Sequence, residues 1–261
     1  MLEKRTKIVT FDYCLFGDYE KYYKQLCLNI LRVRDIDLTG YTASVVINVD
    51  HSVPDTFIKK LRIKGADITV HQNKFNTLSE GMMSRYSSIV NGGVYASLVR
   101  DADSEIKDVE VELIKLWLDS KYTAHIFRDH MSHVMPVMGG LFGIKSSLFM
   151  SYSKIFNKKK AVYYGDYGND QRFLSNEIYP YLRRNGLLIF SSTYVFPFET
   201  IHMISNTKAS IGDYSILYTM SEQLTKHKYT FLPYVIVKFL NYRLFTRVKL
   251  KGWCCIREAR L

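Results

Sequence analysis

Two aspartates lie one residue apart in the segment RDADS, which directly follows the apolar run VYASLV. Alternate residues of a strand share a face, so a strand that ends here can direct the carboxylates of Asp101 and Asp103 at one ion. Carboxylate oxygens are hard ligands that suit Mg²⁺ or Mn²⁺, and these ions keep coordination positions open for phosphate oxygens. A bare Asp-x-Asp also recurs as a solvated turn. Its place after the fourth expected strand is what favours a metal site.

A third acid, Asp170, stands in the segment YGNDQ at the start of an expected helix. An acid at this position commonly serves only as an N-terminal cap. Near a bound metal, the same carboxylate could instead act as general base on a hydroxyl group. Asp166 lies close by in the sequence and competes for either role. The residues alone favour the cap and leave the base open.

A cation and two glycines could contribute to the same site. Arg85 lies in the segment SEGMMSRYSSIV, a helical pattern just before the Asp-x-Asp strand. From there it could reach a diphosphate, with a surface salt bridge as the alternative. Gly139 and Gly140 allow the backbone to approach a ligand closely, although a tight turn between strands explains them equally well.

Three histidines, His125, His130 and His133, occur within a short segment that precedes the two glycines. Histidine nitrogens bind zinc, but no cysteine or carboxylate completes a familiar zinc spacing here. A structural zinc site is therefore the less favoured interpretation of this segment.

The elements that must position these residues alternate between strands and helices. Apolar or β-rich runs indicate strands, and helical periods with caps indicate the helices between them. The expected strands are 7–11, 43–49, 66–71, 94–99 and 122–127, and the expected helices are 18–34, 54–64, 78–90 and 108–118. This alternation predicts an α/β domain with a mostly parallel sheet. In such sheets, ligands bind beyond the carboxyl ends of the strands.

The composition bounds the class of protein. A chain of 261 residues with 47% apolar residues can bury a sizeable core, which argues against wholesale disorder. The formal net charge of +11 predicts attraction to anions such as nucleotides, anionic lipids, nucleic acid or acidic glycans. Residues 1–200 are expected to form the catalytic domain. Residues 201–261, basic and aromatic from about Lys226, are expected to form an appendage that packs on it.

Location follows from what the sequence lacks. No apolar stretch is long enough to span a bilayer, and the charged N-terminus has no secretory apolar region. The four cysteines form no disulfide or zinc framework, so we expect free thiols in a cytoplasmic protein. The basic tail could dock peripherally on the inner face of an anionic membrane. A tail packed on the domain with solvated cations is the favoured alternative.

Several segments, taken in order, carry a resemblance to a known family. They are FDYCLFGDYEKYY, GADITV, EGMMSRY, RDADSE, HIFRDHMSH, GGLFGIK and YGNDQRFLSNEIYP. This order resembles small GT-A glycosyltransferases of bacterial surface-polysaccharide clusters and large algal viruses, including the domains that build chlorovirus capsid glycans. The resemblance covers roughly residues 8–182. It implies a GT-A, Rossmann-like fold and transfer of a sugar from a nucleotide-sugar, with UDP-sugars favoured, to a glycan or lipid-linked glycan acceptor.

The resemblance also implies roles for residues on the donor side. Asp101 and Asp103 match the family's metal-binding motif for Mn²⁺ or Mg²⁺. Tyr13 and Phe16 match the loop that contacts the nucleotide. Arg85 matches an arginine that faces the donor.

Further roles concern the donor sugar and the acceptor. His130, Gly139 and Gly140 match the wall around the donor sugar and the entrance for the acceptor. Asp170 matches the acid beside the acceptor, which is the general base if the enzyme inverts the anomeric configuration. The sequence does not decide between inversion and retention.

Two other classes of function remain as alternatives. A nucleotidyltransferase acting on sugar phosphates would also combine an α/β sheet, acidic metal ligands and a nucleotide, but no glycine- and lysine-rich triphosphate loop is present. A non-catalytic basic module for membrane or nucleic acid would account for the net charge. It would leave the clustered RDADSE, GG and GNDQ segments unexplained, so nucleic acid is not an expected partner.

Overall fold

The computed structural model describes residues 7–17, 19–71, 74–128, 133, 135–191, 199–203 and 257–258. The strands are β1 (Lys7–Leu15), β2 (Tyr41–Val49), β3 (Ala66–Val70), β4 (Ala96–Arg100), β5 (Ala124–Arg128), β6 (Leu141–Lys145), β7 (Leu187–Ser191), β8 (Thr200–Met203) and β9 (Arg257–Glu258). The α-helices are α1 (Tyr19–Asp35), α2 (Asp55–Ile63), α3 (Leu78–Met83), α4 (Ser87–Asn91), α5 (Asp108–Asp119), α6 (Phe149–Lys159), α7 (Asn169–Phe173) and α8 (Tyr179–Arg184). Shorter helical turns are η1 (Ser84–Tyr86), η2 (Ser146–Leu148), η3 (Lys160–Tyr163) and η4 (Leu174–Ile178).

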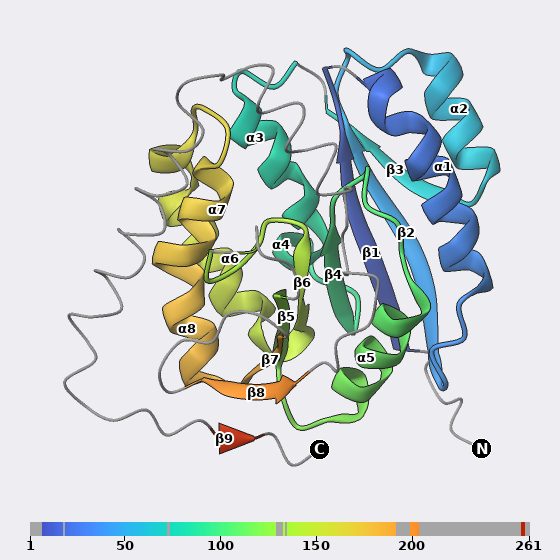
Figure 1. Ribbon diagram of the computed structural model, residues 1–261. Helices are drawn as coiled ribbons and strands as arrows, with labels where there is room; N and C mark the ends of the chain where they lie inside the picture. The colour runs from blue at the N-terminus through green and yellow to red at the C-terminus, as the bar shows by residue number, and fades with distance from the viewer. Residues whose placement is uncertain are drawn as a thin grey trace, which may run out of the picture.

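The described strands form one sheet in the order β3-β2-β1-β4-β6-β5-β7-β8-β9, with helices along both faces (Figure 1). All neighbouring strands in it are parallel except at β6, which runs antiparallel to both β4 and β5. The expected α/β class with a mostly parallel sheet and flanking helices is therefore confirmed. The reversed strand β6 was not expected. It begins directly after Gly139 and Gly140, which lie in a turn between strands.

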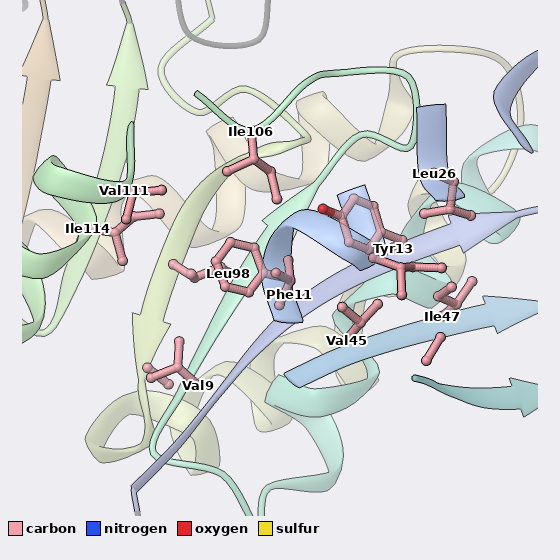
Figure 2. Close-up of a cluster of buried hydrophobic side chains, with 14 of the residues drawn as sticks. Val9, Phe11, Tyr13, Leu26, Val45, Ile47, Leu98, Ile106, Val111 and Ile114 are labelled. Atoms are coloured by element: carbon pink, nitrogen blue, oxygen red, sulfur yellow. The ribbon is translucent and has the colours of Figure 1, made fainter. Parts of the chain in front are cut away.

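Alternate strand residues divide between two hydrophobic clusters, one on each face of the sheet. In the first cluster, Val9, Phe11 and Tyr13 of β1 pack with β2, β4 and helices α1, α2 and α5, as Figure 2 shows in part. In the second, strands β4 to β7 pack against α3, α4, α6, α7 and α8. Leu98 belongs to the first cluster and its neighbour Val99 to the second. This alternation is the two-residue period that a sheet covered on both faces requires.

A polar network replaces apolar packing where β1 faces α4. The carboxylate of Asp12 is fully buried and accepts hydrogen bonds from Thr10 and Ser97, both at 2.7 Å, and from Ser88. Burial raises the pKa of Asp12 to about 6 despite these hydrogen bonds. The network explains why β1 extends to Leu15, beyond the expected end at Phe11: buried hydroxyl groups accommodate the acid that interrupts the apolar run.

The helix expected over 78–90 is broken into three pieces, with the 3₁₀ turn η1 between α3 and α4. Thr77 caps the first piece by accepting a hydrogen bond from the Glu80 N–H at 3.2 Å. Arg85 lies in η1, and both it and Tyr86 are buried. A 3₁₀ segment inside a helix often marks a hinge or a strained sequence, and this one carries the arginine of the expected site.

The expected boundary at residue 200 stays a prediction; β8, which begins there, pairs with β7 and continues the sheet. A buried ion pair anchors this region: Arg128, the last residue of β5, donates to the two carboxylate oxygens of Glu199 at 3.0 and 2.5 Å. Apart from residues 201–203 and 257–258, which extend the sheet, the expected basic appendage lies outside the described residues. Within the part of the chain that the structure describes, no helix has the length and apolarity needed to cross a bilayer.

Candidate active site

The Asp-x-Asp loop, residues 101–104, leaves the sheet at the carboxyl end of β4, as expected. Arg100, the last residue of β4, is buried and forms an ion pair with Glu110 of α5 at 3.0 Å. At the other end of the loop, the backbone carbonyl of Ser104 accepts a hydrogen bond from the Asn29 side chain at 2.9 Å. These contacts to α5 and α1 fix both ends of the loop that carries the two aspartates.

Arg85 lies between two carboxylates and is almost fully buried, with 2% of its side chain exposed. One guanidinium nitrogen pairs with Asp101, and the other donates to Asp170 Oδ2 at 3.0 Å. Burial alone would lower the pKa of Arg85, but the charge of Asp101 and other neighbours raises it well above its usual value. The site therefore contains a permanently charged guanidinium held between the Asp-x-Asp loop and α7.

The acids of the site differ in their surroundings. The Asp101 side chain is 39% exposed, whereas that of Asp170 is fully buried. Burial, together with the charge of Asp101, raises the pKa of Asp103 to about 6. Burial also raises the pKa of Asp170 and outweighs the opposing effect of Arg85. Two carboxylates thus pair with one guanidinium and a third lies on the same loop as Asp101, and this excess of negative charge suits a cation.

Gly139 and Gly140 lie directly against these charged groups. A Cβ atom at Gly139 would come within 2.5 Å of an Arg85 nitrogen and 2.7 Å of Asp170 Oδ2. A Cβ atom at Gly140 would overlap the Asp101 carboxylate and lie 2.6 Å from the Asp101 backbone nitrogen. The expected turn is present, and its backbone lies against the charged side chains, which is possible only because the two residues lack side chains.

The donor set fits Mn²⁺ or Mg²⁺. Asp101 and Asp103 provide carboxylate oxygens on one loop, and Oδ1 of the nearby Asp170 has no hydrogen-bond partner among the described residues. Those residues contain no group of three or more side chains placed to enclose an ion. Magnesium-type sites commonly use one or two carboxylates and take further ligands from substrate phosphates and water. An ion held by these carboxylates would therefore need further ligands from phosphate and water.

A second group of side chains lies at the carboxyl ends of β1, β2 and β3. Phe16 and Phe75 pack edge to face at 5.4 Å, and His71 lies 4.8 Å from Phe75. Asp50 accepts hydrogen bonds from the backbone N–H groups of Phe75 and Ser52, both at 2.9 Å. Burial opposes ionisation of Asp50, but a hydrogen bond from the Ser52 hydroxyl, together with these two backbone bonds, holds its pKa below the usual value.

Of these four residues, only Phe16 was among the expected site residues; Asp50, His71 and Phe75 were not. The available signal was that Asp50 directly follows the apolar run of β2, just as Asp101 follows that of β4. His71 likewise follows β3.

The expectation for Tyr13 needs correction. Its side chain is fully buried in the core beside Phe11 and Val45, within β1 rather than in a loop (Figure 2). Odd-numbered residues of β1 point into this cluster because side chains alternate along a strand. A nucleotide could not reach the Tyr13 ring without unpacking the core, so we exclude Tyr13 from the candidate site.

The remaining expectations concern His130, the other histidines and Asp166. His130 lies outside the described residues. His125 is buried, packs 4.4 Å from Trp117, and burial lowers its pKa to about 3. It is therefore a neutral core residue, which favours the interpretation without zinc. Asp166 is exposed, whereas Asp170 faces Arg85.

No protein-family model and no curated protein matches the sequence. Among solved structures, the mannosyltransferase PcManGT from Pyrobaculum calidifontis, in complex with GDP-Man and Mn²⁺, is 12% identical, with a TM-score of 0.42 over 57% of this chain. S. aureus TarS 1–349 in complex with UDP-GlcNAc is 13% identical, with a TM-score of 0.47 over 77% of this chain and 60% of its own. A 4-diphosphocytidyl-2C-methyl-D-erythritol synthase from Anaerococcus prevotii is 10% identical, with a TM-score of 0.47 over 71% of this chain and 87% of its own.

This chain matches about half the length of the mannosyltransferase, 47% of it. Likenesses this distant do not establish an activity.

Proposed function

We propose that this chain is a metal-dependent glycosyltransferase that moves a sugar from a nucleotide-sugar, with UDP-sugars favoured, to a hydroxyl group of a glycan or lipid-linked glycan. The observation that supports this most directly is the convergence of Asp101, Asp103, Arg85 and Asp170 beneath a glycine turn at the carboxyl end of β4. The resemblance of the ordered sequence segments to GT-A glycosyltransferases supports the same function.

The proposed donor site joins the two groups of side chains at the carboxyl edge of the sheet. Phe16 and Phe75 flank the nucleotide end, and Asp101 and Asp103 hold Mn²⁺ or Mg²⁺ at the diphosphate end. The ion would supply charge neutralisation for the departing diphosphate. Arg85 is already desolvated and held in place, so its charge can stabilise the same leaving group without reorganisation.

Asp170 is proposed to accept the proton of the acceptor hydroxyl as that oxygen attacks the anomeric carbon, provided the enzyme inverts. Its Oδ1 is free of hydrogen bonds among the described residues, and its pKa is raised. In the conformation described, Gly139 covers this carboxylate, so the role requires substrate binding to open that cover. A retaining enzyme would not need this base, and Asp170 would then serve only to orient Arg85.

A thermal-shift panel tests the donor site. UDP, GDP, dTDP, their common sugars and the corresponding triphosphates are each added with and without Mn²⁺. A ligand that binds only the folded state at about one hundred times its Kd stabilises the protein by about 2.7 kcal/mol. We expect a shift that requires Mn²⁺ with one nucleotide family, and its loss in Asp101→Ala and Asp103→Ala.

The matched control is Asp67→Ala, which removes an exposed acid of β3 away from the site. It should retain the full shift. The absence of a shift with every nucleotide, or an undiminished Mn²⁺-dependent shift in both site variants, would contradict the proposal. Release of pyrophosphate from a nucleoside triphosphate would support a nucleotidyltransferase instead.

A further inference from the structure

A buried ion pair lies directly next to the Asp-x-Asp loop. Arg100, the residue before Asp101, has 2% of its side chain exposed, and its partner Glu110 of α5 is fully buried. Leu98 packs in the cluster that includes α5, so Arg100, two residues further along β4, lies on the same face of the sheet. The pair therefore belongs to the core that supports the loop.

The guanidinium of this pair also holds the end of the loop. Its Nη2 donates to the backbone carbonyl of Glu105 at 3.2 Å, while Nη1 faces Glu110. The carbonyl of the preceding Ser104 accepts from the Asn29 side chain of α1 at 2.9 Å. Gln25 donates to Asn29 Oδ1 at 3.2 Å and so orients that amide. Two successive carbonyl groups after the aspartates are thus held by side chains of β4 and α1.

The loop itself is a tight turn. The Ser104 N–H donates to the Asp101 carbonyl at 3.3 Å, which closes a β-turn with Asp103 at its third position. Strand β4 fixes the start of this turn, and Arg100 and Asn29 fix its end. The relative position of the two carboxylates therefore depends on these contacts. Metal sites need such precision, because metal–oxygen distances vary by only about 0.2 Å.

Stability alone does not account for the buried pair. Removing two charges from water is costly, and replacement of a buried ion pair by apolar residues of similar volume is often neutral or stabilising. An apolar side chain in place of Arg100 could fill the same space. It could not donate to the Glu105 carbonyl, which is the contact that joins the pair to the loop.

We propose that Arg100 is a positioning residue for the metal, an inference that rests on the proposed glycosyltransferase function. Glu110 orients the guanidinium, and the guanidinium holds the end of the loop. Asp101 and Asp103 are thereby kept in the arrangement that binds a divalent ion together with a diphosphate. Arg100 supplies no ligand to the ion and acts only through the loop.

The test measures binding of Mn²⁺ to the full chain in the presence of UDP, GDP or dTDP, from the electron paramagnetic resonance signal of the free ion. Arg100→Lys keeps the charge but lacks the planar fork that reaches two acceptors. The double variant Arg100→Met with Glu110→Leu removes the pair without changing the local net charge. The control is Lys145→Met, which removes a buried cation at the end of β6 remote from the glycine turn.

Hydrogen–deuterium exchange of the peptide that spans residues 101–107 is measured in parallel, without metal or nucleotide. We expect both Arg100 variants to bind Mn²⁺ about tenfold or more weakly, as is typical when groups that orient metal ligands are removed. Exchange in residues 101–107 should be faster in the same variants. The control should match the unaltered chain in both measurements, because a general loss of stability is not confined to one loop.

The inference is overturned if the double variant binds Mn²⁺ as tightly as the unaltered chain, or if exchange in residues 101–107 does not change. An equal loss of Mn²⁺ affinity in Lys145→Met would likewise overturn it, since the effect would then be one of stability. Failure of the unaltered chain to bind Mn²⁺ with any of the three nucleotides would contradict the proposed function instead. Exchange in the loop would still decide whether Arg100 holds it.

Discussion

At the residue scale, the distribution of counter-charge decides what each acid can do. Asp101 is partly exposed and shares Arg85 with the fully buried Asp170, while Asp103 has a pKa raised to about 6 by burial and by Asp101. A partly exposed carboxylate can bind a metal ion without a change in the surrounding structure. A buried carboxylate with a raised pKa is suited to accept a proton. The roles proposed for Asp101 and Asp170 rest on this difference in their surroundings.

The first prediction concerns the proposed general base. Asp170→Asn should lower turnover by about a hundred- to ten-thousand-fold, because proton acceptance by a positioned group typically contributes that factor. Nucleotide affinity should change little. The base acts when deprotonated, so the activity of the unaltered enzyme should rise with pH through a pKa above the ordinary 3.8. Steady-state rates across pH give both results.

The neighbouring Asp166→Asn, which removes an exposed acid of the same turn, is the control and should leave turnover near normal. Near-normal turnover in Asp170→Asn would remove that residue from the role of base.

The second prediction concerns the glycine turn. Gly140→Ala places a methyl group onto the Asp101 carboxylate, so Asp101 must move away from the position proposed to hold the ion. We expect the Mn²⁺-dependent stabilisation by nucleotide to be lost and the free energy of unfolding to fall by about 1–3 kcal/mol, as is typical of overpacking. Chemical denaturation with and without ligand measures both effects. Retention of the full ligand effect in a folded variant would show that the close approach is not required.

At the scale of elements, one buried acid, Asp12, connects β1, β4 and α4 by hydrogen bonds. Asp12 of β1 accepts hydrogen bonds from Ser97 of β4 and Ser88 of α4. Ser88 is three residues beyond Arg85, so the network holds the segment that carries the arginine against the sheet. The desolvated carboxylate also lowers stability at neutral pH, because its ionisation is less favourable than in the unfolded chain.

The third prediction follows from this network. The folded protein retains the Asp12 proton up to about pH 6, whereas the ordinary carboxyl value is 3.8. The folded state therefore binds more protons between these values, and its stability falls as pH rises through that window. A shift of this size corresponds to about 3 kcal/mol as an upper bound.

The asparagine of Asp12→Asn cannot ionise, so the stability of this variant should not fall through this window. Its free energy of unfolding should therefore rise relative to that of the unaltered protein between about pH 4 and pH 6. Urea unfolding at several pH values measures the difference. Asp67→Asn, an exposed control, should run parallel to the unaltered chain. Parallel curves for Asp12→Asn would show that the buried carboxylate titrates normally.

At the scale of the whole molecule, the formal net charge of +11 contrasts with the acidic site. A net positive charge attracts anions such as nucleotides at long range, whereas a diphosphate in the proposed site would need a cation to offset the carboxylates there. Charge of this kind is sensitive to salt, unlike the buried contacts of the site.

The fourth prediction separates this general attraction from recognition of nucleic acid. Any binding of labelled duplex DNA at about 50 mM salt should fall steeply by about 200 mM, because it would depend on released counterions alone. Fluorescence anisotropy measures this, and Mn²⁺-dependent nucleotide binding at the higher salt serves as the comparison. DNA binding that persists at the higher salt and competes with nucleotide would favour a binding module over an enzyme.

Much of the fold could be predicted from local pattern. Strands β2 and β4 were expected because continuous apolar runs indicate strands buried on both faces. The direction of β6 could not be predicted, because its sequence LFGIK is as apolar as the parallel strands of the sheet. Only its pairing with β4 and β5 sets its direction. The end of β1 was placed too early because Asp12 interrupts the apolar run, and its hydroxyl partners come from distant elements.

The sequence by itself determined which chemistry is available: paired carboxylates after a strand, an arginine before it, a glycine turn and an acid that begins a helix. These depend on residue type and short spacing, which local backbone geometry converts into position. Only the tertiary structure decided that Arg85 pairs with Asp101, 16 residues away, and with Asp170, 85 residues away. It also decided that Tyr13 belongs to the core, because burial and charge pairing are set by which elements pack together and not by neighbours in the chain.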